Sequence, residues 1–324
     1  FYSPLKACDP YLRFVFLTGI TKFSQLSIFS ELNNILNISM LKPYAAICGI
    51  TQEEMQEQMT AYIERLAVSQ EMSKEETLQK LKEKYDGYHF TWPSPDIYNP
   101  FSLLNAFAND ELNNYWFGSG TPTYLIEMLR KFHVLPSQLG GSMQAMAADF
   151  DAPTEKMESI VPLLYQSGYL TIKGYDEEFG MYRLGFPNRE VEEGVVRFLF
   201  PFYANVNKVE SPFEIQKFVR EVRFGDYDSF FRRLQSFFAN TTYEVIREQE
   251  LHYENVFFIV FKLVGFYTQV EYHTSKGRID LVLQTDKLIY VMEFKLDGTA
   301  EEALQQIHDK HYALPFASDG RKLF

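Results

Sequence analysis

Phosphate-binding loops, paired cysteines and long apolar runs are all missing from this sequence. No G-x-x-x-x-G-K-[ST] string occurs, which excludes a self-contained P-loop nucleotidase within these 324 residues. The two cysteines, Cys8 and Cys48, lie far apart in apolar surroundings and form no zinc-spacing motif, so we expect buried free thiols in a reducing cytoplasm. No apolar run approaches the roughly 18 residues of a membrane-spanning helix, so we expect no membrane partner.

Clustered positive charge is also lacking. The formal net charge is −12, and residues 241–324 carry nine Lys/Arg against 13 Asp/Glu, a local balance of −4 (9 − 13). Electrostatic binding to nucleic acid depends on cations that displace counterions from phosphates. The composition therefore does not favour a long phosphate-binding face. The hydrophobic fraction of 46% does favour large cores. The length of 324 residues leaves room for two domains or three small ones.

Two apolar, β-prone segments near the C-terminus contain ionisable residues. Asp280 lies within 277–283, and Glu293 and Lys295 lie within 289–295. Successive side chains of a strand point to opposite faces, so Glu293 and Lys295 share one face. Charged groups among apolar neighbours are costly unless they pair or bind a metal ion. These three residues are therefore candidates for a functional site.

The polar linker 284–287 between the segments predicts an antiparallel hairpin that brings Asp280 beside Glu293. Two converging carboxylates suit a hard divalent cation such as Mg²⁺ or Mn²⁺, which activates water and stabilises charge on a phosphoryl oxygen. Lys295 then orients or deprotonates the attacking water, or balances charge in the transition state. The structural alternative is a buried salt bridge between Lys295 and one acid.

Asp280, followed 13 residues later by Glu293-Phe294-Lys295, resembles the motif of the PD-(D/E)xK nuclease superfamily, with Ile279 in place of the proline. The strings GRID at 277–280, EFKL at 293–296 and EEALQQI at 301–307 resemble, more closely, the PD-(D/E)xK-like domain at the C-terminus of AAA-ATPase-like proteins abundant in gut Bacteroidetes. The resemblance implies that Asp280 and Glu293 bind the metal ion and that Lys295 is the catalytic lysine. It also implies a nucleic-acid substrate, with DNA expected.

Two further residues enter through the same resemblance. Gln306 resembles a glutamine on the helix after the second core strand, which lies beside the metal ion or the DNA; the alternative is a polar residue on an amphipathic helix. Glu250 resembles an acidic metal ligand on the first helix, with Glu248 and Glu254 as competitors and a solvated helix face as the alternative. The core expected from the family is a helix containing 256–264, three strands and a helix near 300–313.

The N-terminal part resembles the later half of the AAA-ATPase-like domain in the same proteins. Residues 12–19 form a continuous apolar run, typical of a parallel strand buried on both faces, and end in Thr18-Gly19. In the family a strand ending in TG(I/V)xKF carries a nucleotide sensor, which corresponds to Thr18, with Lys22 as its companion. The P-loop elements precede this segment in the family. The resemblance therefore predicts that these residues are a fragment that does not hydrolyse ATP by itself. We expect ATP to bind only to a full-length protein.

Between these ends, a helix at 155–166, strands at 168–172 and 181–186 and a helix from 187 resemble a winged-helix-like lid, and residues 211–240 predict bridging helices. We interpret the YDGYHF string at 85–90 as residues that pack against neighbouring elements or form a turn. In the family the chain continues into another strand beyond residue 324, so the resemblance suggests a shortened C-terminus.

The sequence thus predicts an α/β protein that combines a partial P-loop ATPase-like module with a PD-(D/E)xK restriction-endonuclease-like domain. The expected divisions are 1–145 (ATPase-like), 146–205 (winged-helix-like lid), 206–240 (helical linker) and 241–324 (nuclease-like). The expected function is Mg²⁺-dependent phosphodiester hydrolysis of nucleic acid, controlled by the ATPase-like module. The alternative is a non-catalytic regulatory or interaction protein of the signalling-ATPase type that uses a nuclease-like fold.

Overall fold

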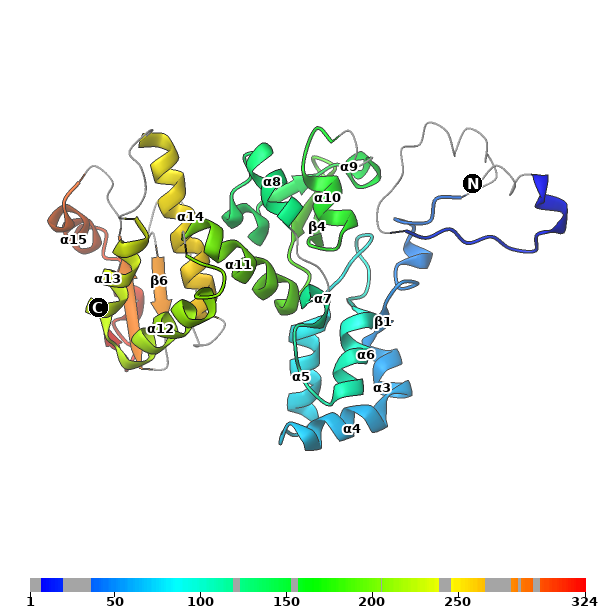
Figure 1. The fold of residues 1–324 in the computed structure, drawn as a ribbon, viewed down its shortest axis with the longest axis horizontal. Coiled ribbons are helices and arrows are strands. Elements are labelled where there is room, and N and C mark those ends of the chain that lie inside the picture. The colour runs from blue at the N-terminus through cyan, green and yellow to red at the C-terminus, as the bar shows by residue number, and fades with distance from the viewer. Residues whose placement is uncertain are drawn as a thin grey trace. The chain divides into compact units, whose positions relative to one another are not determined.

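The computed structural model describes residues 7–19, 36–118, 123–152, 157–204, 206–238, 246–265, 281–284, 287–293 and 298–324. Within them the chain is a mixed α/β protein that divides into two compact units, 1–195 and 196–324 (Figure 1). None of the described helices is long and apolar enough to cross a membrane. The divisions predicted at 145/146, 205/206 and 240/241 stay predictions.

The first unit contains a helical lobe of four helices and a small two-stranded sheet. Its elements are β1 (Ile50–Thr51), α3 (Gln52–Gln58), α4 (Thr60–Ser69), α5 (Lys74–Tyr85), β2 (Ile97–Tyr98) and α6 (Pro100–Asn109). Met55, Leu66, Leu81 and Tyr98 are fully buried in its core. Helix α6 has Pro100 at its first position, where a proline costs no hydrogen bond.

Side-chain caps fix where the helices of this lobe begin. Thr51 and Ser73 each accept a hydrogen bond from the backbone three residues on, at Glu54 and Glu76, whose carboxylates bond back. These reciprocal pairs satisfy amide groups that a helix start otherwise leaves without partners. The lobe is therefore specified locally, by sequence patterns only four residues long.

A three-stranded antiparallel sheet forms the rest of the first unit, with strand order β3-β5-β4. The elements after α6 are α7 (Tyr115–Gly118), α8 (Thr123–Lys131), η3 (Pro136–Gly140), β3 (Met143–Ala145), α9 (Ala147–Asp151), α10 (Val161–Gln166), β4 (Thr171–Asp176), β5 (Met181–Gly185) and α11 (Arg189–Tyr203), which continues into the second unit. The predicted order of helix, hairpin and helix is confirmed, although α10 starts six residues later than expected. Its identity as a winged helix stays a prediction.

Two expectations for the N-terminal region are wrong. Residues 12–19 are not a buried strand, since they lack regular structure and leave Phe14 80% exposed. A buried parallel strand needs hydrogen-bonded neighbours, and no described strand pairs with this run. Cys8 and Cys48 are exposed rather than buried. Ile47, next to Cys48, is itself 55% exposed, so the apolar neighbours do not form a core around the thiol.

The second unit combines a helical layer with a small sheet. Its elements are α12 (Ser211–Phe224), α13 (Tyr227–Phe238), α14 (Ile246–Gly265), β6 (Leu281–Gln284), β7 (Leu288–Met292), α15 (Ala300–Asp309), η5 (Leu314–Phe316) and β8 (Lys322–Leu323). The helix predicted to contain 256–264 and the helices predicted within 211–240 are confirmed. Residues 266–280, between α14 and β6, lie outside the described residues.

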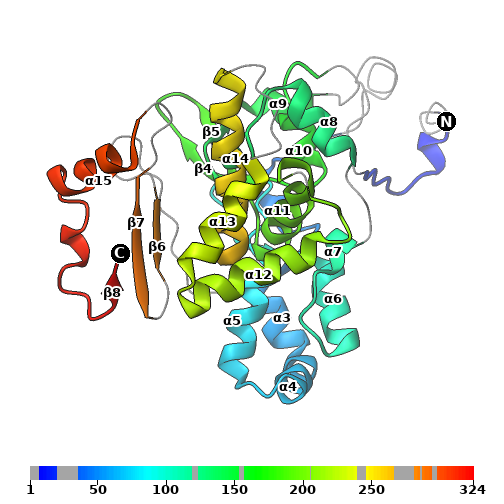
Figure 2. The same cartoon turned by 60° about the vertical axis from the view of Figure 1, so that its left-hand side comes forward.

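The sheet of this unit has the order β6-β7-β8, with β6 antiparallel and β8 parallel to β7. The predicted hairpin is therefore confirmed, and the last residues of the chain form part of a strand. Figure 2 shows α12, α13 and α14 on one side of β6 and β7, and α15 on the other. Tyr290 of β7 points toward the helical layer, where its ring lies 5.0 Å from that of Tyr227.

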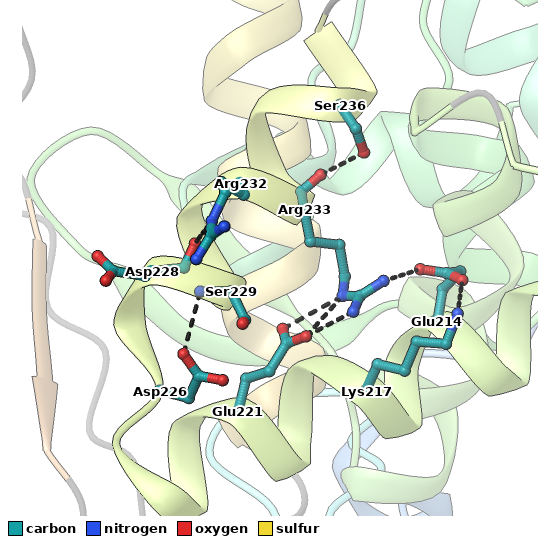
Figure 3. A network of polar contacts seen from close by, with 9 residues as sticks. All are labelled: Glu214, Lys217, Glu221, Asp226, Asp228, Ser229, Arg232, Arg233 and Ser236. Atoms are coloured by element: carbon teal, nitrogen blue, oxygen red, sulfur yellow. Dashed lines mark hydrogen bonds and ion pairs between the residues drawn. The ribbon is translucent and has the colours of Figure 1, made fainter.

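Arg233 joins the first two helices of the layer. Its guanidinium on α13 donates to the carboxylates of Glu221 and Glu214, both on α12 (Figure 3). The side chains are largely buried, at 10% exposed for Glu221 and 18% for Glu214. Behind this network Phe218 and Phe230 pack edge to face, with ring centroids 5.2 Å apart. The network thus lies over an aromatic core.

Candidate active site

Glu293 directly follows β7, on the face of the sheet opposite the helical layer. Tyr290 points toward that layer, and the two-residue period of a strand places Ile289, Val291 and Glu293 on the other face. Ile289 and Val291 are buried, at 0% and 8% exposed, and Glu293 is half-buried beside them. Backbone alternation therefore places a carboxylate at the end of an apolar strand face.

Helix α15 supplies the partner of this carboxylate. The helix begins at a capping box, in which Thr299 Oγ1 accepts from the Glu302 amide at 3.2 Å and the Glu302 carboxylate accepts from the Thr299 amide at 2.9 Å. Ala303 and Gln306 are three residues apart and so share one helix face, on which Ala303 is buried. From that face the side-chain amide nitrogen of Gln306 donates to Glu293 Oε1. The predicted proximity of Gln306 and Glu293 is thus a contact in the structure.

The other predicted site residues divide into three groups. Asp280 and Lys295 lie outside the described residues, as does Lys22. Glu250 lies in α14, the helix that precedes the sheet. Thr18 is exposed in the irregular segment 12–19, so its predicted place at the end of a buried strand is wrong, and its role as a nucleotide sensor stays a prediction.

Within the described ranges, no group of three or more His, Cys, Asp or Glu side chains is arranged to hold a metal ion. That search does not reach Asp280. The groups that the structure does bring together are a carboxylate and a carboxamide, which are oxygen donors of the kind that hard divalent cations prefer. The chemistry of the site therefore fits Mg²⁺ or Mn²⁺ better than a softer metal ion.

A second polar cluster, which the sequence pattern did not single out, lies in the first unit around the YDGYHF string. His89 is buried and contacts two side chains: its Nε2 is 2.8 Å from Asp96 Oδ1, and its Nδ1 is 2.9 Å from Ser94 Oγ. Lys173 of β4 donates to the carbonyl oxygens of Gly87 and Pro187, both at 2.9 Å. These contacts connect α5, the following loop, β4 and the segment before α11.

Asp86 lies at the start of this loop and is 3% exposed. Its pKa is raised to about 6, mainly by burial and in part by nearby Asp96, while the backbone amide of Gly87 and the cations Lys82 and Lys173 oppose the rise. Burial also lowers the pKa of His89 and that of Lys173. The only trace of this cluster in the sequence is that Asp86, His89 and Asp96 fall within 11 residues, a spacing that does not by itself indicate a site.

Comparison with known proteins bears on the C-terminal part most directly. Residues 248–324, from α14 to β8, match the PD-(D/E)XK nuclease superfamily. Over 338 aligned positions the chain is also 30% identical to a protein of Azotobacter chroococcum mcd 1 described as an uncharacterized protein in the vnfD 5′ region. The match covers 99% of this chain but 61% of that protein, so the chain spans about three-fifths of the relative's length. No solved structure matches the chain significantly. The C-terminal part of the chain is therefore a PD-(D/E)XK nuclease superfamily domain.

Proposed function

We propose that the C-terminal domain is a metal-dependent nuclease that hydrolyses phosphodiester bonds in nucleic acid. The superfamily match to residues 248–324 and the contact between Gln306 and Glu293 support this function. The contact is the observation that carries the proposal, because it joins two motif residues, 13 positions apart, at one end of the sheet. A chance occurrence of the sequence motif does not require that contact.

The strand register supports a place for Asp280 in the same site. In the antiparallel register of these strands, Leu281 pairs with Met292 and Val282 pairs with Val291. Position 280 lies outside the described residues, and we expect it to continue this register by one step, opposite Glu293. Directly opposed residues of antiparallel strands project to the same face, roughly 5 Å apart. We therefore propose Asp280 and Glu293 as the metal ligands, with Glu250 of α14 as a candidate third.

A bound Mg²⁺ or Mn²⁺ would lower the pKa of a water ligand and neutralise charge on the phosphate. The chain's own groups hold and orient the reactants. Glu293 presents its carboxylate at the end of the apolar strand face, and Gln306 fixes that carboxylate through Oε1. Lys295 lies outside the described residues; its two-residue spacing from Glu293 in the sequence is the ground on which we assign its ammonium group the role of orienting the attacking water or balancing transition-state charge.

The test is cleavage of linear and circular DNA and of RNA with Mg²⁺ or Mn²⁺, using the parent protein and the variants Asp280→Asn, Glu293→Gln and Lys295→Ala. We expect each variant to lose most of the activity and EDTA to abolish it. Glu301→Gln, an exposed acid on the first turn of α15, is the matched control and should retain activity. Cleavage that survives both acid substitutions would overturn the proposal.

A non-catalytic regulatory protein is the second candidate, and the distribution of charge favours it. The first unit holds 15 Lys/Arg and 25 Asp/Glu, a balance of −10 (15 − 25). Such acidity disfavours contact between this unit and nucleic acid and suits binding to a basic protein. This candidate predicts no cleavage of any of these substrates by the parent protein.

A further inference from the structure

Helix α15 ends in a fixed geometry immediately after Lys310. The Lys310 amide donates to the Gln306 carbonyl at 3.0 Å, so the helical repeat continues through Lys310. His311 then adopts a left-handed conformation, with a φ of +54°, and the Tyr312 amide donates back to the Ile307 carbonyl at 3.1 Å. This is the Schellman end of a helix, and the buried ring of Tyr312 anchors it. Lys310 therefore has a defined place at the end of α15.

Lys310 lies on the side of α15 that faces the sheet. It follows Gln306 by four residues and Ala303 by seven, and side chains at this spacing share one helix face. Ala303 is buried on that face, and Gln306 donates from it to Glu293 Oε1. One helix turn, about 6 Å, separates the Cα atoms of Gln306 and Lys310. The face that holds the Glu293 carboxylate thus ends in a cation.

The charge of Lys310 is not neutralised within the part of the chain that the structure describes. Its side chain is exposed, and its ammonium group has no ion pair or hydrogen bond with a described residue. The nearby acids have other partners. Asp309 accepts from Gln305 at 2.7 Å. Asp319 accepts from Arg321 at 2.6 Å. Lys310 therefore offers an ammonium group that no described acid occupies.

A nuclease site built from carboxylates repels the phosphates of its substrate. The proposed ligands Asp280 and Glu293 place two negative charges at the end of the sheet, and a bound divalent cation offsets them at the phosphate that is cleaved. The neighbouring phosphates of the strand still meet this repulsion. A lysine within their reach opposes it, and each phosphate that a lysine neutralises also releases counterions. Lys310, one turn beyond the residue that holds Glu293, has the charge and the position for this contact.

We propose that Lys310 binds the nucleic-acid backbone at a phosphate close to the one that is cleaved, and so positions the strand over Glu293. The separation of about 6 Å along α15 corresponds to about two nucleotides at a rise of 3.4 Å each. An ammonium group contacts a phosphate as a point charge, so the contact does not read base sequence. The proposal rests on the proposed nuclease function, because that site supplies the phosphate that is cleaved.

Binding is tested by fluorescence anisotropy with Mg²⁺ over a range of salt concentrations, on a labelled 20-base-pair DNA duplex and a labelled 20-nucleotide RNA. The background is Lys295→Ala, so that the ligand stays intact. Lys310→Gln should reduce the slope of log K against log salt by about 0.9 on the duplex and about 0.7 on the single strand, the values for one lost phosphate contact. At about 0.1 M salt, binding should be about tenfold weaker. Lys310→Arg keeps the charge and should keep the slope.

Cleavage kinetics give a second readout. Lys310→Gln should raise KM about tenfold and leave kcat within about twofold, because a contact that bound substrate and transition state share affects binding alone. Lys322→Gln is the matched control, since Lys322 is an exposed lysine of the same sheet. It pairs with Leu288, at the other end of β7 and roughly 16 Å along the strand from Glu293. The control should leave both KM and the salt slope unchanged.

A purely structural role for Lys310 gives a different result. A cation in the last turn of a helix stabilises it through the macrodipole, so a loss of stability in urea with an unchanged KM and salt slope would overturn the proposal. Cleavage by the parent that Lys310→Gln matches in KM would contradict only the Lys310 contact. Binding that weakens in Lys310→Gln, without cleavage by the parent, would contradict only the nuclease. Absence of binding would contradict both.

Discussion

Arg233 Nε donates to both carboxylate oxygens of Glu221, at 2.9 Å to Oε1 and 3.2 Å to Oε2. This fork holds α13 against α12, and the same guanidinium reaches Glu214 at 2.9 Å. Hydrogen bonds from a guanidinium to a carboxylate are among the stronger ones in proteins. One arginine therefore joins these two helices through two carboxylates of α12.

Arg233→Ala should lower the free energy of unfolding of the second unit by about 2–3 kcal/mol, because it removes the guanidinium that pairs with the largely buried carboxylates of Glu221 and Glu214, of which Glu214 keeps its ion pair with Lys217. Urea denaturation of the parent and the variant measures this loss. Arg232→Ala, at the neighbouring exposed position, is the control and should cost less than about 1 kcal/mol. A double variant with Glu221→Ala should cost less than the sum of the two single changes. Strict additivity would show that the pair is not coupled.

Asp86 should make the first unit more stable in mild acid. Its pKa is about 6 in the folded protein, against about 4 for an unfolded aspartate, so the folded state binds the proton more tightly. The contribution is present below pH 4 and is lost as pH rises to about 6. Above pH 6 the charged, buried carboxylate of Asp86 costs on the order of 3 kcal/mol of stability, and Asp86→Asn removes this cost. The stability of the variant relative to the parent should therefore grow between pH 4 and 6.

Denaturation curves of the parent and Asp86→Asn across that pH range measure the effect. Asp228→Asn is the control, since it makes the same substitution at an exposed carboxylate. A difference between Asp86→Asn and the parent that does not change with pH would contradict a raised pKa of Asp86 in the folded protein.

Gly87 should not tolerate a side chain. Its φ is +106°, which residues with a Cβ rarely adopt, and an added Cβ would lie 2.4 Å from the carbonyl oxygen of Pro187. That carbonyl also accepts from Lys173, so the loop cannot easily move. We expect Gly87→Ala to destabilise the first unit by about 2 kcal/mol or more, measured by thermal unfolding. Gly140→Ala, where a Cβ meets no atom within 4 Å, should be nearly neutral.

Gln306 should act by positioning Glu293. If the proposed nuclease is active, Gln306→Ala should lower the cleavage rate about 10- to 100-fold at limiting Mg²⁺, and added Mg²⁺ should restore part of it, because a carboxylate that has lost its hydrogen-bond donor binds the cation more weakly. Gln305→Ala is the matched control, since Gln305 bonds to Asp309 on the same helix instead. An equal loss at saturating Mg²⁺ would indicate a different role.

Much of the second unit could be predicted from short patterns in the chain. Alternation and a polar linker predicted the hairpin of β6 and β7, and the Thr299 cap predicted the start of α15. The proximity of Gln306 and Glu293 followed from resemblance to a family, since spacing alone does not say which helix face meets which strand. The predicted metal ligand Asp280 lies outside the described residues, so its place in the site stays a prediction.

The sequence by itself determined the local elements, because caps, turns and hydrophobic periodicity act over a few residues. Only the tertiary structure decided exposure, which depends on whether distant segments meet. The apolar run 12–19 lacks a described neighbouring strand and is exposed, whereas Asp86, which resembles a surface turn residue in the sequence, is buried. Likewise, Arg233 of α13 reaches Glu221 of α12 across 12 residues, so this ion pair depends on how the two helices pack rather than on composition.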